Sequence, residues 1–399
     1  MENHEPVRIG HSQLPDSVHA AAEAAGMILE QMGPSGKAGW ALVFCGGRHD
    51  RNRILQTLRA ELGDIDMIGG AAVGTITRDS LGYGGYECAV AAFPATFPTP
   101  RVIADHGLDA GEFEAGCRLG ERIGDAARDG DTVLLFYDSV RGGPPPVLYI
   151  GSRLVDGIHR GLGNKTVTLI GAGTVADFHL SDSFVFDGRD VAKHAAVAVV
   201  LPSNFLSRTT IMHGCIPLSA FLEITRIDGA VLYELEGRPA RDLLLEMAGT
   251  DDVSMSLTIG EKHGDPFAPY DESAYANRLI LRTDPENGSA TLFEADFREG
   301  TRVQIMARDN RLMLESAAKR TRELLDALQG TNPVFALYID CAGRSRAFSG
   351  AESEEAGIVR NEIGGRIPLL GFYSGVEIAP LLGKSRPLDW TGVLTVFTV

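Results

Sequence analysis

Two short segments with matching residues follow apolar runs in distant parts of the chain. Cys45-Gly46-Gly47-Arg48 ends one run, and Cys341-Ala342-Gly343-Arg344 ends another. Ligands of α/β proteins usually bind where strands end, and a guanidinium is a planar donor that suits a carboxylate. Arg48 and Arg344 are therefore candidate ligand-binding residues.

The segment 371–377, GFYSGVE, follows a third apolar run and supplies further candidates. Glu377 would accept an ammonium group, Tyr373 offers a hydroxyl and a ring face, and Gly371 opens the segment. With the two arginines, these residues would suit an amino-acid-like ligand. The alternative is an internal ion pair between Arg344 and Glu377 that fixes the loops.

Cys341 is a further candidate because it stands at a strand end. A nucleophilic cysteine needs a nearby base to form its thiolate, and no histidine follows His263 in the sequence. We therefore expect Cys341 to be a small buried residue or to line a ligand site. Metalloprotease, Walker A, nucleophile-elbow and paired-carboxylate signatures are absent from the sequence, so we do not expect an enzyme.

The segment Gly171–Ala176 matches G-x-G-x-x-A after an apolar run. A dinucleotide site would require a helix directly after it, but FHLSDSFVFDG predicts loop and strand. A tight turn that needs glycine is the preferred interpretation here and for the similar segment at Gly69.

Charge and composition restrict the partners and the compartment. The 399 residues carry a net charge of −16, which disfavours nucleic acid and anionic lipid as partners. The first residues have no apolar signal region, no apolar run is long enough to cross a membrane, and the five cysteines are scattered. These features predict a cytoplasmic protein.

The N-terminal half repeats one order of elements. A helix (15–33), a strand (40–45), a helix (52–62) and a Gly-rich segment at 69–74 are followed by a strand (131–137), a helix (151–162), a strand (166–170) and a second Gly-rich segment. We therefore predict a domain at 15–205 that contains a duplicated α/β unit, with copies at about 15–100 and 101–205.

A second α/β domain is predicted at 206–399. Asp228-Gly229 indicates a hairpin, and residues 310–328 an amphipathic helix capped by Asp309. A strand (332–341), a helix (352–363), a strand (367–372), a loop that contains Glu377 and a last strand (392–399) resemble the repeated order. The predicted fold class is α/β, with mixed sheets and flanking helices.

The sequence resembles the FIST family over residues 15–399. The segments IGGAAVG and LIGAGTVAD are similar to the FIST N domain, and HGCIPLSAFLEITRIDG is similar to the start of the FIST C domain. The most specific match is LYIDCAGR, followed by GRIPLLGFYSGVEIAP and TGVLTVF. The family's usual glycine before the glutamate is Val376 here.

The resemblance implies a bacterial sensor of small ligands, with no fused kinase, cyclase or F-box, whose signal passes to a partner such as a histidine kinase. Some stand-alone relatives bind haem and sense nitric oxide. No covalent haem motif is present, and His213, His179, His194 and His106 are the candidate axial ligands, of which His213 is retained.

The sequence leaves four functions open. Three of them are a sensor with a ligand between the two halves and no cofactor, a haem-based sensor, and a ligand-free adaptor that binds proteins through its C-terminal half. The fourth is an enzyme without a recognised signature, which would require convergent polar groups in a pocket.

Overall fold

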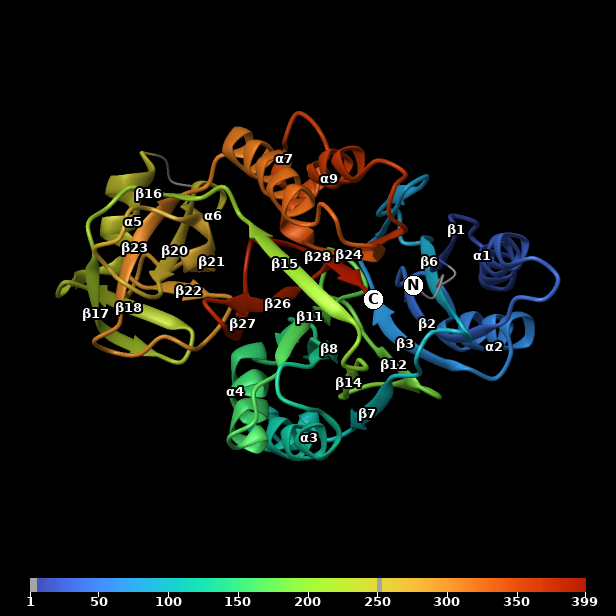
Figure 1. The fold of residues 1–399 in the computed structure, drawn as a ribbon. Helices are drawn as coiled ribbons and strands as arrows, with labels where there is room; N and C mark the ends of the chain where they lie inside the picture. Colours follow the sequence, from blue (N-terminus) through green and yellow to red (C-terminus); the bar gives the residue numbers. More distant parts are fainter. Residues whose placement is uncertain (1–5, 250–252) are drawn as a thin grey trace.

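The computed structural model describes residues 6–249 and 253–399. Three α/β units surround a shared core, and a β-barrel projects from the third unit (Figure 1). The predicted α/β class with mixed sheets and flanking helices is confirmed. No helix in these residues is long and apolar enough to cross a membrane.

Unit 1 spans residues 8–94. Its elements are β1 (Arg8–Ser12), α1 (Ser17–Met32), β2 (Ala38–Cys45), α2 (Arg51–Leu62), β3 (Asp66–Ala71), the hairpin strands β4 (Thr75–Thr77) and β5 (Leu81–Gly82), and β6 (Cys88–Pro94). Both helices begin after an aspartate whose carboxylate accepts two backbone N–H groups, Asp16 for α1 and Asp50 for α2.

Unit 2 repeats this order. Its elements are β7 (Arg101–Asp105), η1 (Leu108–Ala110), α3 (Glu112–Ala126), β8 (Thr132–Asp138), β9 (Val140–Gly142), β10 (Val147–Leu148), α4 (Gly151–Leu162), β11 (Thr168–Thr174), the hairpin strands β12 (Val185–Gly188) and β13 (Val191–Ala192), and β14 (Ala196–Val200).

Unit 3 has the same order, interrupted by the barrel. Its elements are β15 (Leu206–Met212), α7 (Asn310–Ala327), β24 (Pro333–Cys341), η3 (Ala342–Arg344), α8 (Arg346–Ser349), α9 (Glu355–Ile363), β25 (Leu369–Ser374), the hairpin strands β26 (Val376–Leu381) and β27 (Lys384–Leu388), and β28 (Gly392–Thr398). Asp309 caps α7, as the sequence predicts.

The units exchange hairpins in a closed cycle. The three sheets have the orders β1-β6-β2-β3-β12-β13, β7-β14-β8-β11-β26-β27 and β15-β28-β24-β25-β4-β5. Each sheet therefore ends in the hairpin of another unit. The duplication and the domain boundary at 205/206 stay predictions of the sequence. One sheet joins strands of the two predicted repeats, and the other two join strands from both sides of the predicted boundary.

The barrel is inserted between β15 and α7. Its elements are β16 (Ile216–Pro217), β17 (Leu222–Asp228), β18 (Val231–Leu235), β19 (Arg238–Pro239), α5 (Ala240–Ala248), α6 (Val253–Ser256), β20 (Leu257–Lys262), η2 (Glu272–Ala274), β21 (Tyr275–Thr283), β22 (Ala290–Leu292) and β23 (Arg302–Ala307). The ring β23-β17-β18-β22-β21 closes through β20, which pairs with β23. The predicted hairpin at Asp228-Gly229 joins β17 to β18.

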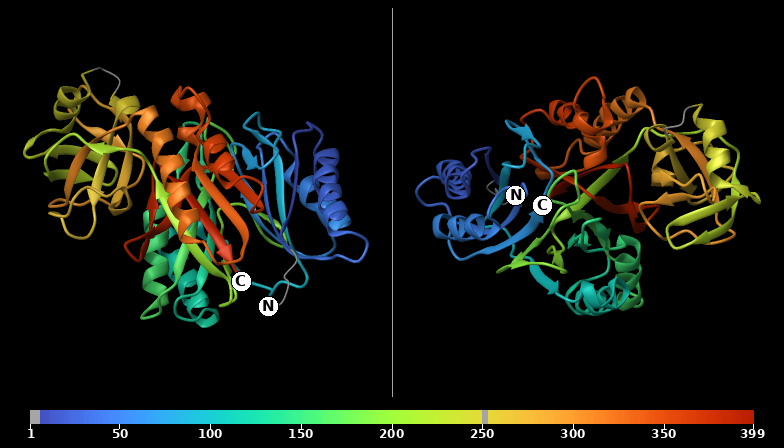
Figure 2. Two further views of the ribbon diagram at one scale, coloured as in Figure 1. Left: turned by 45° about the horizontal axis from the view of Figure 1, so that its top comes forward. Right: turned by 180° about the vertical axis from the view of Figure 1, so that it is seen from behind.

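The inner faces of the three sheets meet in one aromatic core, while the paired helices cover the outer faces (Figure 2). Phe44, Phe136 and Phe372 each come from a different unit. The ring of Phe44 stacks on that of Phe372 with centroids 3.8 Å apart, and it meets the Phe136 ring edge-on at 5.3 Å. Because all three side chains are fully buried, the centre of the molecule is filled by side chains.

The Gly-rich segments are strands, so the tight turns preferred from sequence are wrong. Gly171 lies within β11, where a Cβ atom would approach the carbonyl oxygen of Leu135 to 1.7 Å. Gly69 lies within β3, and its Cβ atom would lie 2.1 Å from the carbonyl oxygen of Val43. These glycines allow two parallel strands to approach closely rather than reverse the chain.

The loop expected around Glu377 is also a strand. Glu377 lies in β26 and pairs with Ala172 of β11 in another unit. On its other side β26 pairs with β27, where Glu377 lies opposite Leu388, so the strand is part of a hairpin that the sequence analysis did not identify.

Helices α3 and α4 of unit 2 pack through glycines. A Cβ atom on Gly120 of α3 would lie 2.3 Å from the carbonyl oxygen of Ile158 in α4. Four residues along the same helix, a Cβ atom on Gly124 would find nothing closer than 3.9 Å.

Gly120→Ala therefore separates two helices, whereas Gly124→Ala fills open space and improves helix propensity. We expect Gly120→Ala to lower the free energy of unfolding by about 1–3 kcal/mol. Gly124→Ala should leave it unchanged or raise it by up to about 1 kcal/mol. Denaturant unfolding of both variants measures the difference, and equal effects would contradict close helix packing at Gly120.

Candidate functional site

The loop that carries Arg48 is held by backbone hydrogen bonds on both sides. The amide of Gly46 donates to the carbonyl of Glu87 at 2.8 Å, and that of Gly47 donates to the carbonyl of Ala176 at 3.2 Å. His49, next in sequence, is buried, and its Nε2 lies 2.8 Å from the carbonyl oxygen of Tyr86. The Arg48 side chain therefore extends from a fixed backbone.

The opposite wall, residues 83–86, is fixed by a buried carboxylate. Glu87 accepts the amides of Gly84 at 2.6 Å and Gly85 at 2.8 Å. The Arg48 guanidinium lies 5.2 Å from the centroid of the Tyr86 ring, a cation–π distance.

A cavity of about 220 Å³ lies beside Arg48 at the carboxyl ends of β2, β3 and β11. It is lined by Gly47, Arg48, Val73, Tyr83, Gly84, Gly85, Ala176, Asp177, Phe178 and His179. The carboxylate of Asp177 accepts the amides of His179 and Ser181. Arg48 itself is exposed, and no described carboxylate forms an ion pair with it, so its charge is available to a ligand.

His179 also lines a larger neighbouring cavity of about 560 Å³. Arg141, Lys193 and His194 are among its lining residues. Lys193 is paired with Asp182, and the Arg141 guanidinium lies 5.9 Å from the Tyr149 ring centroid. The two cavities together form a region with several basic side chains on a protein of net charge −16.

Tyr373 lies in the protein interior next to this region, and its side chain does not line the cavity. It is fully buried, and its hydroxyl donates to Glu354 at 2.6 Å. Tyr83, a wall residue of the Arg48 cavity, donates to the other oxygen of Glu354 at 3.2 Å. Burial and the nearby carboxylates raise the pKa of Tyr373. Glu354 therefore joins the cavity wall to the start of α9.

Arg344, the counterpart of Arg48 in sequence, has a different environment. Its side chain is fully buried, and its Nε donates to Glu355 at 2.8 Å. Its guanidinium also donates to the backbone carbonyls of His213 and Trp390. Burial opposes its charge, but Glu355 and Asp340 raise the pKa of Arg344, so it remains a cation inside the protein.

Glu377 is also internal, and Arg344 pairs with Glu355 and Asp340 instead of Glu377. Glu377 accepts a hydrogen bond from the Ser374 hydroxyl at 2.7 Å, and burial raises its pKa well above the usual range. The arrangement expected from sequence, with Arg48, Arg344 and Glu377 around one ligand, is not formed in this structure.

The remaining two candidates from sequence are packing residues in this structure. Gly371 lies in β25, where a Cβ atom would approach the carbonyl oxygen of Tyr338 to 2.6 Å. Cys341 ends β24 and is buried, and burial raises the pKa of its thiol well above the usual range. A ligand role for either stays a prediction of the sequence.

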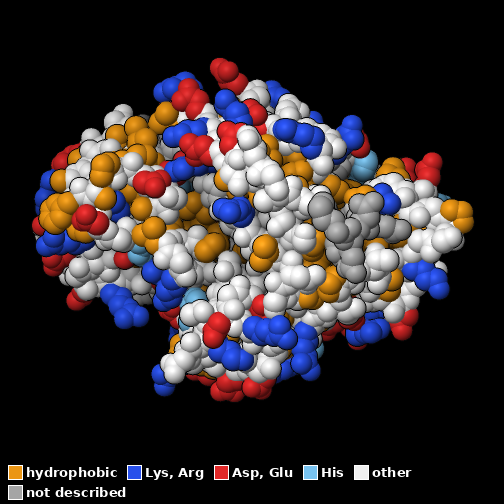
Figure 3. Space-filling view, viewed as in Figure 1, with side chains coloured by type: hydrophobic (Ala, Val, Ile, Leu, Met, Phe, Trp, Pro, Cys, Tyr) orange, Lys and Arg blue, Asp and Glu red, His pale blue; other side chains and the backbone are white. Residues whose placement is uncertain are grey.

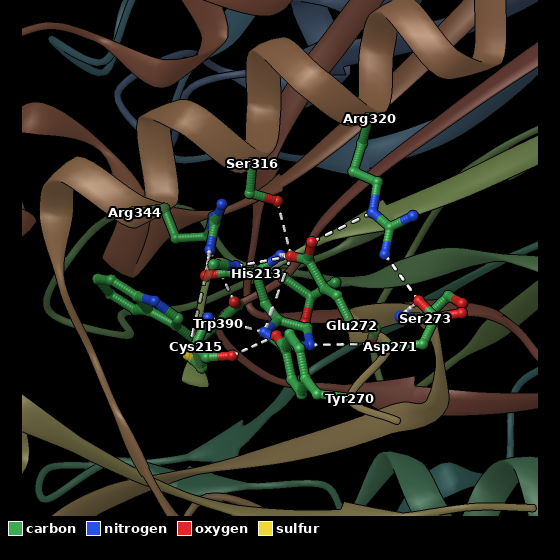
Figure 4. Close-up of polar contacts among 12 residues, drawn as sticks. His213, Cys215, Tyr270, Asp271, Glu272, Ser273, Ser316, Arg320, Arg344 and Trp390 are labelled. Carbon is green, nitrogen blue, oxygen red and sulfur yellow. Dashed lines mark hydrogen bonds and ion pairs between the residues drawn. The ribbon is translucent and has the colours of Figure 1, made fainter. Parts of the chain in front are cut away.

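His213, the candidate haem ligand, is buried in a polar network at the junction of the barrel, β15 and α7 (Figure 4). Its Nε2 lies 3.0 Å from the carbonyl oxygen of Glu272, and its Nδ1 accepts the amide of Cys215 at 2.9 Å. Burial lowers the pKa of His213. Because both ring nitrogens are engaged, His213 does not suit axial ligation of a haem.

Glu272 organises this network. Its carboxylate accepts the amide of Gly214 at 2.7 Å and the Ser316 hydroxyl at 2.6 Å, and it pairs with Arg320 at 3.2 Å. Burial alone would raise its pKa, but His213 and these donors outweigh burial and lower the pKa of Glu272 to about 2. The barrel is thereby tied to β15 and α7 by a buried carboxylate.

Other charged groups at the site were missed by sequence reasoning. Glu354 precedes α9 and Glu355 begins it, and the sequence predicts this segment only as a helix. Tyr83 lies in a segment that shows no recognisable sequence pattern. The spacing of Glu355 from Arg344 offers no local signal, because the two are not on one helix face. Within residues 6–249 and 253–399, no group of three or more His, Cys, Asp and Glu side chains is arranged to hold a metal ion.

Because the pKa of Glu272 is lowered in the folded state, the free energy of unfolding depends on pH. The folded-state value of about 2 lies below the ordinary 4.5, so the stabilisation is complete above about pH 4.5 and is lost as the pH falls toward 2. It amounts to roughly 3 kcal/mol. We expect Glu272→Gln to destabilise the protein by about 1.5–3 kcal/mol at pH 7, because a neutral amide weakens the charge-assisted hydrogen bonds from Gly214, Ser316 and Arg320. Arg320 keeps Asp271 and Glu323 as partners. The stability of the variant should also vary less with pH in that window.

Denaturant unfolding across the pH range measures both effects. Glu315→Gln is the matched control, because Glu315 forms an exposed pair with Arg311 on α7. The control should change stability by less than about 1 kcal/mol. If the stability of Glu272→Gln falls with pH as much as that of the unaltered protein, the lowered pKa of Glu272 is contradicted.

Comparison with known proteins covers nearly the whole chain. An uncharacterised protein of Mycobacterium tuberculosis is 29% identical, over 98% of this chain and 99% of that protein. An uncharacterised protein of Mycobacterium bovis is 27% identical, over 98% of each chain.

Solved structures are similar only distantly. A cyanuric acid hydrolase from A. caulinodans aligns over 98% of both chains with 11% identity and a TM-score of 0.36. A chorismatase aligns over 91% of this chain and 93% of that chain with 8% identity and a TM-score of 0.30. Neither value supports an inference about this chain.

Two family models match in succession. The FIST N domain matches residues 39–238, and the FIST C domain matches residues 240–380. Together they cover most of the chain, so this protein belongs to the FIST family, which is associated with sensing in signal transduction.

Proposed function

We propose that this protein is a sensor that binds a small carboxylate-bearing ligand, which includes amino acids, beside Arg48 and acts through a separate signalling protein. The observation that carries the proposal is the state of Arg48. It is an exposed guanidinium on a fixed loop, beside a cavity at strand ends, and it pairs with no carboxylate of residues 6–249 or 253–399. A fixed donor of this kind loses little conformational freedom when it binds a carboxylate.

The cavity walls support the same ligand class. Tyr83 and Phe178 form an aromatic wall in which the two rings meet edge to face, with centroids 5.9 Å apart. A volume of about 220 Å³ suits a ligand of few heavy atoms, with room to extend past His179 into the neighbouring cavity.

The cavity walls also contact helices α8 and α9, which could transmit ligand binding to a partner protein. Tyr83 bonds to Glu354 at the start of α9, and the Phe178 ring stacks on Phe348 of α8 with centroids 6.4 Å apart. Phe348 is half exposed. A ligand that moves Tyr83 or Phe178 would therefore change the α8–α9 surface, on which we place the contact with a partner such as a histidine kinase.

Binding, rather than catalysis, is the better account of these groups. The buried thiol of Cys341 has a raised pKa and is not poised as a thiolate. The haem alternative receives no support from His213, whose ring nitrogens bond within the protein.

The experiment is a thermal-shift and calorimetric titration with amino acids and simple carboxylates. A ligand that binds the folded state raises the melting temperature of the unaltered protein. Loss of a charge-assisted hydrogen bond costs about 1.5–3 kcal/mol, so Arg48→Gln should weaken binding by roughly tenfold or more. Arg48→Lys should retain part of the affinity, because it keeps the charge without the planar donor.

Arg53→Gln is the matched control, because Arg53 is an exposed arginine on α2 that pairs with Asp50. It should leave affinity unchanged. If no carboxylate raises the melting temperature of the unaltered protein, or if Arg53→Gln weakens binding as much as Arg48→Gln, the proposal fails.

A further inference from the structure

A second cleft lies where the barrel meets the β26–β27 hairpin and helix α4. Figure 1 shows β27 between the barrel and α4, and Figure 3 shows a notch there with basic side chains on both sides. The cavity has a volume of about 280 Å³, and its walls include Arg298 of the barrel, Lys384 and Arg386 of β27, and Ser152 of α4. It shares no lining residue with the Arg48 cavity.

The three cations of this cleft have no ion-pair partner among the described residues, whereas one of its three carboxylates does. Asp296 accepts the guanidinium of Arg278 at 2.8 Å. Asp156 and Glu261 are the remaining carboxylates of the lining. Unpaired positive charge therefore exceeds unpaired negative charge in the cleft, although the whole protein is strongly acidic.

Two donors in the cleft are buried, and one of them has no partner among the described residues. The side chain of Ser152 is 4% exposed, and its hydroxyl lies beside the carboxylate of Glu294. Nε of Arg386 is buried and makes no hydrogen bond with the described residues. Buried polar groups are nearly always hydrogen-bonded, so an unpaired donor on the wall of a cavity indicates a missing acceptor.

The backbone that presents these donors is fixed. Glu294 of the barrel accepts the amides of Gly151 at 3.0 Å and Ser152 at 2.8 Å, which holds the start of α4. On the other side, the Ser385 hydroxyl accepts the amide of Leu169 at 2.9 Å, which holds β27. The cationic and hydroxyl donors are thus held before any ligand arrives.

We infer that this cleft binds a small phosphate-type oxyanion, either free phosphate or the phosphate group of a small monoester. Acceptor oxygens on one small anion would pair with Nε of Arg386 and reach the Ser152 hydroxyl, while Arg298 and Lys384 neutralise its charge. The anion would bridge the barrel, unit 2 and the hairpin of unit 3. This site is independent of the proposed carboxylate site at Arg48.

The test is calorimetric titration of the full chain with inorganic phosphate and, separately, with glycerol phosphate, at constant ionic strength set by chloride. We expect saturable binding of at least one, and we expect Arg386→Gln and Arg298→Gln each to weaken it by roughly tenfold or more. Preference for glycerol phosphate would assign the monoester, and preference for inorganic phosphate would assign the free anion.

Two controls separate this site from others. Arg311→Gln removes one exposed cation from α7 and should leave phosphate affinity unchanged. Arg48→Gln should also leave it unchanged, so loss of carboxylate binding and loss of phosphate binding are distinguishable. Ser152→Ala keeps the backbone bond to Glu294 and should weaken binding without unfolding the protein. Absence of saturable binding, or equal weakening by Arg311→Gln and Arg386→Gln, would overturn the inference.

Discussion

The exchange of hairpins between the three α/β units is the constraint on which the rest of the structure depends. No unit completes its own sheet, because each sheet ends in the hairpin of another unit. The three inner faces consequently meet in one core, where Phe44, Phe136 and Phe372 leave no room for a central ligand. A ligand site must therefore lie outside this central core.

Burial then separates charged groups that look alike in sequence. Arg48 and Arg344 follow the same kind of strand in similar motifs, yet one is exposed beside a cavity and the other is enclosed by Glu355, Asp340 and two backbone carbonyls. The difference arises because the segment after β15, the start of α9 and the segment before β28 enclose Arg344. One arginine therefore stabilises the junction, and the other remains available to a ligand.

Local patterns predicted the elements better than their assembly. The helices at α1, α2, α4 and α7 and the hairpin at Asp228-Gly229 follow from caps, periodicity and turn residues, which act within a few positions. The strand that holds Glu377 pairs with β11 of another unit, and Arg344 pairs with Glu355 on a separate helix of its own unit, so no local pattern encodes either contact. Of the site, only Arg48 could be placed beside a cavity from its position after a strand, while Tyr83, Glu354 and the cleft around Arg386 required the fold.

The measurement that most directly tests the sensor account is a nuclear magnetic resonance titration that follows the side-chain Nε–H signals of isotope-labelled arginine. When a carboxylate ligand identified by thermal shift is added, the account predicts a saturable shift of the Arg48 signal, assigned by its loss in Arg48→Gln. The signal of the buried Arg344 should stay in place. A ligand that shifts the Arg344 signal and leaves that of Arg48 unchanged would contradict the account.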